Sequence, residues 1–275
     1  MEHRVIRAES WDHLCGALFD ESWQPNLLRF RSHYAYKGLS SADYSLSTSL
    51  MRLGGNFSDV ERHILRNFRK YAQVDAMSAD ALWNWLALAQ HHGLPTRLLD
   101  WTYSPFVALH FATVNLADPG RDSIVWCVDY VRAHALLPKK LQRVLEVEGS
   151  DVWTSEMLGN HVPTWEALEE AGGKDNVLLF FEPPSLDQRI VNQYALFSVL
   201  SSPSIAIDEW LREHPDLLKR IVIPSALRWE VRDKLDQANI NERVLFPGLD
   251  GLSSWLRRHY SAGPVQKAVD DMNEP

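Results

Sequence analysis

The sequence predicts a protein of the α+β class, in which helices surround a mixed β-sheet core. Apolar runs of strand length are interspersed with amphipathic helical patterns along most of the chain. Residues 90–112 contain a helix end, a strand and a helix start with no spacer, so three elements meet there. With 275 residues, 45% of them hydrophobic, the chain is long and apolar enough to bury a full core.

The N-terminal third is predicted to contain both strands and helices. Period-two alternation predicts strands over 5–7 and 27–33, and helical spacing predicts helices over 11–19, 58–73 (opened by a capping box of Ser58 and Glu61) and 79–92. In the 27–33 strand, Arg29 and Arg31 share one face. A guanidinium there is suited to grip a phosphate through two parallel hydrogen bonds, and the alternative is a solvated sheet face.

The central run starts where the 79–92 helix ends at Gly93, and Pro95 prevents its continuation. Residues 96–101 have the length and apolar content of a buried strand. Ser104 and Pro105 then supply an N-cap and a first helical residue, which predicts a second helix from 105 onward. The run therefore predicts helix, strand and helix in immediate succession.

Two polar residues of the central run are candidates for ligand binding. Asp100 and Thr102 lie where the strand ends against the free amides of a helix N-terminus, which is a common place for an anionic ligand. The alternative gives Thr102 a capping or turn role and pairs Arg97 with Asp100 in an internal ion pair. Spacing alone does not separate these two interpretations.

The second half of the chain continues the pattern. Strands are expected at 123–130, 177–182, 195–199, 220–224 and 244–247, with helices at 207–214, 226–239 (capped by Ser225) and 249–260. Residues 131–176 are mostly helical and charged, which indicates an insertion over the core. We expect one domain over 1–262 and a flexible acidic tail over 263–275.

Composition excludes several classes of protein. The net charge of −8 makes nucleic acid a weak candidate partner. The two cysteines lack metal-binding spacing, and no Walker, dinucleotide-binding, nucleophile-elbow or zinc-peptidase motif is present. We therefore expect no metal, no membrane contact and a cytoplasmic location. The eleven tryptophans indicate an aromatic core.

These motifs together resemble the FRG domain family, which is named after a Phe-Arg-Gly tripeptide, and the resemblance covers nearly the entire chain. The matching segments are Phe30-Arg31-Ser32, Leu46–Arg52, Gln90–Ala112, Arg189–Phe197 and Ile240–Leu252. The central signature contains Leu-Pro-Thr-Arg-Leu-Leu-Asp-Trp-Thr and is long and specific. Ser32 replaces the family's glycine and His33 the glutamine that often follows it, so close approach of a ligand at Arg31 is in doubt.

The family in turn resembles the ADP-ribosyltransferase fold, which implies a split mixed sheet and NAD as the substrate. The resemblance implies catalytic roles for Arg31, which would hold the NAD phosphate, for Asp100 and for Gln193, which stands where the transferases carry a glutamate. It implies substrate binding by Ser32, His92, Thr96, Arg97 and Thr102. The resemblance places Asp100-Trp101-Thr102 where the transferases have a Ser-Thr-Ser strand end before a helix, and Ser47-Thr48-Ser49 is a rival for that place. For His92, the alternative is a role at the end of its helix.

The chemistry of such a site is consistent. When nicotinamide leaves, positive charge develops on the ribose, and a carboxylate nearby lowers the barrier. Gln193 has no charge, so Asp100 is the expected anion. We predict an NAD-using ADP-ribosyltransferase or NAD glycohydrolase, as a toxin or anti-phage effector, with an unknown acceptor macromolecule and a regulatory protein partner. The alternative is a non-catalytic module that recognises a nucleotide, a nucleic acid or a protein.

Overall fold

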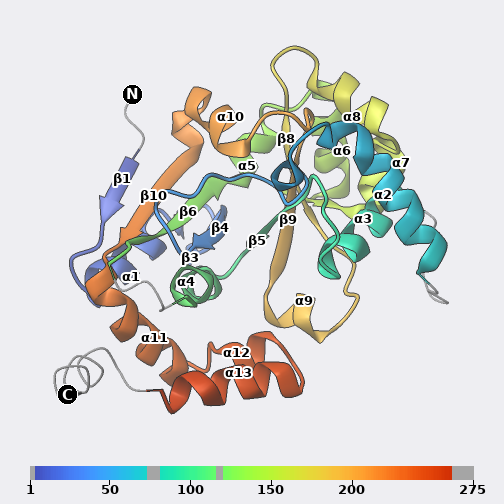
Figure 1. Cartoon of the computed structure of the whole chain (residues 1–275). Coiled ribbons are helices and arrows are strands. Elements are labelled where there is room, and N and C mark those ends of the chain that lie inside the picture. Colours follow the sequence, from blue (N-terminus) through green and yellow to red (C-terminus); the bar gives the residue numbers. More distant parts are fainter. Residues whose placement is uncertain (1–3, 73–80, 116–119, 262–275) are drawn as a thin grey trace.

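The computed structural model describes residues 4–72, 81–115 and 120–261. Its core is an eight-stranded mixed sheet with the strand order β1-β10-β6-β4-β5-β9-β8-β7 (Figure 1). The strands span Arg4–Arg7 (β1), Leu218–Ile223 (β10), Ser123–Asp129 (β6), Tyr34–Leu39 (β4), Leu99–Thr102 (β5), Ala195–Leu200 (β9), Leu178–Glu182 (β8) and Trp153–Thr154 (β7). The β1–β10 and β7–β8 pairs are parallel, and the other pairs are antiparallel. The predicted mixed sheet is confirmed.

Both faces of the sheet are covered by helices (Figure 1). One face carries two apolar clusters; the helices packed around them include α1 (Trp11–Phe19), α4 (Pro105–Thr113), α11 (Arg228–Gln237), α2 (Phe57–Tyr71), α3 (Leu82–His91), α6 (Lys139–Glu148), α7 (Ser155–His161) and α8 (Trp165–Gly172). The other face carries one cluster, with α5 (Tyr130–His134) and α10 (Ile207–Glu213). The remaining elements are α9 (Gln188–Asn192), α12 (Glu242–Leu245), α13 (Leu249–His259), three short 3₁₀ helices (51–53, 215–217, 225–227) and a hairpin of β2 (Trp23–Gln24) and β3 (Arg29–Phe30).

The sheet opens between its two central strands. β4 and β6 pair at six positions, whereas β4 and β5 pair at one, Tyr36 with Thr102. Beyond this pair the two strands diverge toward Leu39 and Leu99. The ammonium of Lys37 lies in this opening and donates to the carbonyl oxygen of Asp100 at 2.9 Å.

Helix α4 packs directly on β4 at Gly38. A Cβ at this position would lie 1.8 Å from the carbonyl oxygen of Ala108, so no side chain fits without moving the helix. Ser104 caps α4 by accepting a hydrogen bond from the amide of Val107, as its sequence predicts. The helix is thereby fixed next to the opening in the sheet.

Most predicted elements are confirmed, with ends shifted by a few residues. The helix over 11–19 has the predicted bounds, and the strand predicted over 195–199 is β9, which is one residue longer. The helical segment 131–176 is present as α5 to α8, but its leucines lie within an apolar cluster instead of covering it. Residue 73 at the end of one predicted helix, residues 79–80 at the start of another and the predicted tail over 263–275 lie outside the described residues.

Three predictions are wrong. The 27–33 strand is reduced to β3, and both of its residues are exposed, because the hairpin lies outside the main sheet. The 244–247 strand is instead the helix α12, which Asn241 caps. Ser58 and Glu61 form no capping box, because Asn56 is the N-cap residue and the Glu61 carboxylate is buried against Arg97.

None of the described helices combines the length and the apolar composition needed to cross a lipid bilayer. The cytoplasmic location and the domain boundaries at 262 and 263 stay predictions.

Candidate functional site

A cavity of about 380 Å³ lies where the sheet opens, and we call it the split pocket. Its walls come from β4, β5 and β9, from the C-terminal end of α3, and from α4 and α9. The charged and amide side chains that line it are Lys37, Gln90, Asp100, Arg189 and Gln193, and the aromatic ones include Tyr36, Trp101, Phe111 and Phe197. Residues far apart in the sequence thus meet in one hollow.

Three of the eight residues predicted for the site line this pocket: Asp100, Thr102 and Gln193. The other five are not among its lining residues: Arg31, Ser32, His92, Thr96 and Arg97. The central signature and the 189–197 segment therefore come together as expected, and the N-terminal tripeptide assigned at 30–32 does not join them.

Asp100 is held at the rim of the pocket by a chain of hydrogen bonds. Its carboxylate accepts from the side-chain amide of Gln90 at 2.7 Å, and the Gln90 carbonyl accepts from the hydroxyl of Thr96 at 2.6 Å. A carboxylate only accepts, so this chain fixes which end of the Gln90 amide faces Asp100. Thr96 thus acts on the pocket indirectly, by orienting Gln90.

The Gln193 side chain is oriented by a neighbouring helix. Its Nε2 donates to the carbonyl oxygen of Leu245 in α12 at 2.9 Å. Since a carbonyl only accepts, one N–H of the amide is used there, and this fixes the Oε1 atom on the other side of the amide, where it can accept from a ligand. The hydroxyl of Thr102 donates to the main-chain carbonyl of Gln193 at 2.7 Å and accepts from the amide of Ser104 at 3.0 Å. Thr102 therefore has the turn role that its position allowed.

Two cations line the pocket that were not singled out in the sequence. Lys37 makes one hydrogen bond within the described chain, to the Asp100 carbonyl, and forms no ion pair there. Burial lowers the pKa of its ammonium, and the nearby Asp100 carboxylate opposes that shift. Arg189 lies over the Phe246 ring, with 5.1 Å between Cζ and the ring centroid, and its buried Nε has no acceptor among the described residues.

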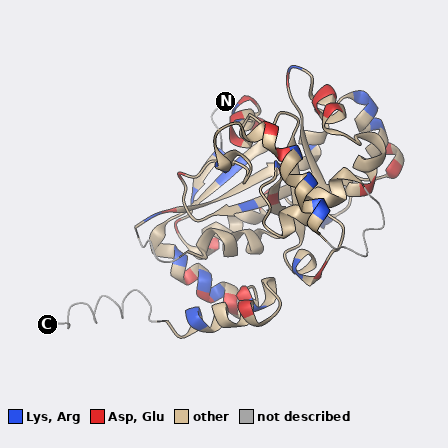
Figure 2. Ribbon diagram, turned by 45° about the vertical axis from the view of Figure 1, so that its right-hand side comes forward, with Lys and Arg blue, Asp and Glu red and all other residues tan. Residues whose placement is uncertain are grey.

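These cations give the pocket a positive balance. Lys37 and Arg189 oppose the single lining carboxylate, Asp100, in a protein whose net charge is −8. A positive hollow in an acidic molecule favours an anionic ligand. Along the helices elsewhere in the ribbon, basic and acidic residues are interspersed (Figure 2).

The remaining predicted residues have other surroundings. The guanidinium of Arg97 pairs with the Glu61 carboxylate, with 2.6 Å between nitrogen and oxygen, and its Cζ lies 3.9 Å from the centroid of the Trp165 ring. The alternative ion pair between Arg97 and Asp100 is therefore not formed. His92 is exposed, and its neighbour His91, paired with Asp187 at 2.7 Å, lines the pocket instead.

The N-terminal candidates lie before β4. The exposed Arg31 donates to the carbonyl of Phe30 at 3.1 Å, because the 27–33 segment does not join the main sheet. The hydroxyl of Ser32 lies 2.8 Å from the Tyr36 hydroxyl. Ser32 therefore contacts a residue of the pocket wall and is not itself a lining residue.

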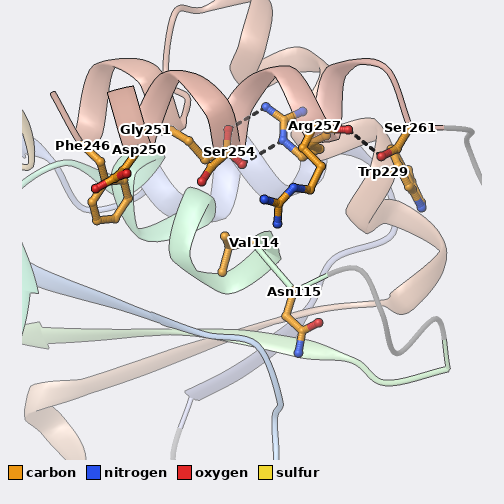
Figure 3. A pocket seen from close by; sticks show the side chains of 11 residues that line it. Val114, Asn115, Trp229, Phe246, Asp250, Gly251, Ser254, Arg257 and Ser261 are labelled. Atoms are coloured by element: carbon orange, nitrogen blue, oxygen red, sulfur yellow. Dashed lines mark hydrogen bonds and ion pairs between the residues drawn. The ribbon is translucent and has the colours of Figure 1, made fainter. Parts of the chain in front are cut away.

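A larger cavity, of about 700 Å³, lies between α13, α11 and the end of α4 (Figure 3). Beside it, Arg258 pairs with Asp236 and Glu242, and Glu242 also pairs with the buried Arg232. These pairs hold α12 and α13 against α11, and through Leu245 they support Gln193. None of the predicted site residues lines this cavity. Within the described residues, no cluster of three His, Cys, Asp or Glu side chains is arranged to hold a metal ion.

A family model, the FRG domain, matches residues 32–120, which confirms the resemblance for this part of the chain. No curated protein and no solved structure matches. The match starts at Ser32, so Phe30 and Arg31 lie outside it. Tyr36-Lys37-Gly38 lies inside it, has the same order of aromatic residue, cation and glycine, and lines the split pocket. Of the two tripeptides, only 36–38 lies within the matched residues and lines the split pocket.

Proposed function

We propose, for a chain whose residues 32–120 match the FRG domain, that the split pocket binds NAD and cleaves its nicotinamide glycosidic bond. The observation that carries the proposal is that Asp100, Gln193 and Lys37 line one pocket at the opening between β4 and β5. The proposal includes an ADP-ribosyltransferase-like split of the sheet at this opening. Transfer to an acceptor or to water, and a role as a toxin or anti-phage effector, belong to the same proposal.

The two sides of the pocket suit the two parts of a nucleotide. Asp100 and the Oε1 of Gln193 accept hydrogen bonds, which matches the hydroxyls of a ribose. Lys37 and Arg189 supply positive charge, which matches a pyrophosphate. A sugar phosphate presents donors and negative charge a few ångströms apart, and this combination supports NAD over a purely apolar or cationic ligand.

In the proposed reaction, the bond between the ribose C1′ and the nicotinamide nitrogen breaks, and its electron pair leaves with nicotinamide. The Asp100 carboxylate stabilises the oxocarbenium-like cation that remains. Water or an acceptor nucleophile then bonds to C1′, and its proton passes to solvent or to Asp100. Gln193 contributes a hydrogen bond to the ribose and no charge.

The test is nicotinamide release from labelled NAD by the purified chain. Substituting Asp100→Asn removes the anion, and Lys37→Met removes the cation, and we expect each to lower kcat/KM by about 10²-fold or more. Arg31→Ala is the matched control, because Arg31 is exposed and lies outside the pocket, and it should release nicotinamide like the wild type. If the wild type neither binds nor cleaves NAD, or if the Asp100→Asn variant keeps full turnover, the proposal is wrong.

A second candidate is a non-catalytic nucleotide-recognition module. The observation that favours it is the uncharged amide at 193, which donates one hydrogen bond to the Leu245 carbonyl, since the transferases have a glutamate at this place. Under this candidate the chain binds NAD or ADP-ribose tightly and releases no nicotinamide. The same assay, run with a binding measurement, separates the two candidates.

A further inference from the structure

A further cavity, of about 340 Å³, lies on the opposite face of the sheet from α4, and we call it the Trp126 cavity. Its walls are the loop of residues 42–45, the middle of β6, β10 and helix α10. The residues that matter for its chemistry are Asp43, Tyr44, Trp126, Arg212 and Arg220.

Two buried donors at this cavity lack acceptors. Trp126 is 5% exposed, and its indole Nε1 has no hydrogen-bond partner among the described residues. The Nε atom of Arg220 is also buried and has no hydrogen-bond partner among the described residues. The guanidinium carbon of Arg220 lies 5.3 Å from the centroid of the Trp126 ring. Buried donors are nearly always paired, so two unpaired donors at one cavity indicate a ligand that brings the acceptors.

The cavity is connected to the split pocket in two ways. Tyr44, which is 49% exposed, lines both. Trp126 is also the direct register partner of Lys37, so the two residues lie side by side on adjacent strands. A ligand whose negative centre is held at Lys37 therefore lies one strand away from the Trp126 cavity.

The lining of the Trp126 cavity fits an uncharged heteroaromatic group. Asp43 and Asp208 balance Arg212 and Arg220, so the cavity has no net charge to hold a phosphate. The side chains of Tyr44, Trp126 and Leu218 provide apolar and aromatic walls. Trp126 and Arg220 donate, and the Asp43 carboxylate accepts, which matches the ring nitrogens and exocyclic amine of a purine.

We propose that the Trp126 cavity binds a nucleobase, the adenine end of a dinucleotide whose nicotinamide riboside end occupies the split pocket. This inference rests on the proposed function, which identifies the other end of the dinucleotide as nicotinamide riboside. The base lies on one face of the sheet and the reacting ribose on the other, joined through the opening between β4 and β5.

The experiment measures binding of adenosine, nicotinamide riboside and NAD to the full chain by calorimetry. Trp126→Phe keeps an aromatic ring and removes the indole donor. It should weaken adenosine and NAD about threefold to tenfold and leave nicotinamide riboside unchanged. Asp100→Asn should do the reverse, weakening nicotinamide riboside and leaving adenosine unchanged. Tyr44→Ala, at an exposed position, should weaken adenosine and keep the thermal stability of the wild type.

The outcomes separate this inference from the proposed function. Adenosine binding that depends on Trp126, without any cleavage of NAD, supports the base site and refutes the enzyme. If the Trp126→Phe and Tyr44→Ala variants bind NAD as tightly and cleave it as fast as the wild type, the base site alone is overturned. Adenosine whose binding is lost in the Asp100→Asn variant occupies the split pocket, and that result also overturns the inference.

Discussion

Replacing Gln193 with glutamate tests the orientation of this side chain, on which the chemistry of the split pocket depends. The wild-type amide donates to the carbonyl of Leu245 at 2.9 Å, and Leu245 is fully buried. An ionised carboxylate has no proton to donate, so the substitution leaves that carbonyl unpaired and places negative charge against it. An unpaired buried acceptor costs about 1–3 kcal/mol, and we expect the free energy of unfolding at pH 7 to fall by about this amount.

The pH dependence gives the prediction its sharpest form. In its protonated form the introduced carboxyl donates to Leu245 and restores the bond, so folding raises its pKa above the unfolded value of about 4.3. For a carboxyl whose folded pKa is raised, the loss of stability is present above the folded pKa and disappears below the unfolded one. A penalty of about 1–3 kcal/mol corresponds to a rise of about one to two pKa units, so the two proteins should converge in stability below about pH 4.

The assay is urea unfolding of the wild type and the Gln193→Glu variant at pH 7 and at pH 4, read by tryptophan fluorescence. Gln193→Met is the matched control, because it also leaves Leu245 unpaired but has no titrating group. Its penalty should be the same at both pH values. A Gln193→Glu variant that is as stable as the wild type at pH 7, or whose penalty does not shrink at pH 4, would refute the reasoning about the amide.

Two further predictions concern buried charges. Glu61→Gln removes the carboxylate that pairs with the buried Arg97, and we expect the free energy of unfolding by urea to fall by about 3–5 kcal/mol. Arg62→Gln breaks the exposed pair with Glu166, and its effect on the same quantity should be far smaller, because solvent screens that pair. Similar losses in both variants would contradict the burial argument. Burial, reinforced by Arg232, lowers the pKa of His110 to about 3, so the unfolded chain takes up a proton below about pH 6.5 that the folded one refuses. Wild-type stability should therefore fall between pH 6.5 and 3, and a His110→Gln variant should lose less over that range in the same assay.

Local signals were sufficient for most of the fold. The proline and serine at the start of α4, the glycine after α3 and the apolar alternation of β9 each act within a few residues, and each prediction based on them is confirmed. The prediction of a strand at 244–247 is wrong because an apolar run this short fits a strand and a helix equally well. The prediction of a strand over 27–33 is wrong for most of its length because this segment has no partner strand in the main sheet. A local sequence pattern does not reveal whether a partner strand is present.

The candidate site divides in the same way. The sequence points to three residues that line the split pocket: Asp100 and Thr102 end a buried strand next to a helix start, and Gln193 precedes a strand. Lys37 was missed, since a lysine near a turn is usually solvated and only the opening of the sheet beside Asp100 gives it a role. The signal that was available is the glycine after it: aromatic residue, cation and glycine recur at 36–38, whereas 30–32 ends in serine.

The glycine explains why this tripeptide, and not an isolated cation, marks the site. At Gly38 the backbone of β4 touches the carbonyl of Ala108, so α4 lies as close to the strand as two backbones allow. Phe111, one turn further along α4, is thereby brought to the wall of the split pocket. Lys37, immediately before the glycine, is turned by the strand pleat away from the helix and into the opening beside Asp100. Close helix packing and a cation aimed between two strands are thus two consequences of adjacent residues. A side chain at 38 would push α4 outward and widen the pocket even with Lys37 in place.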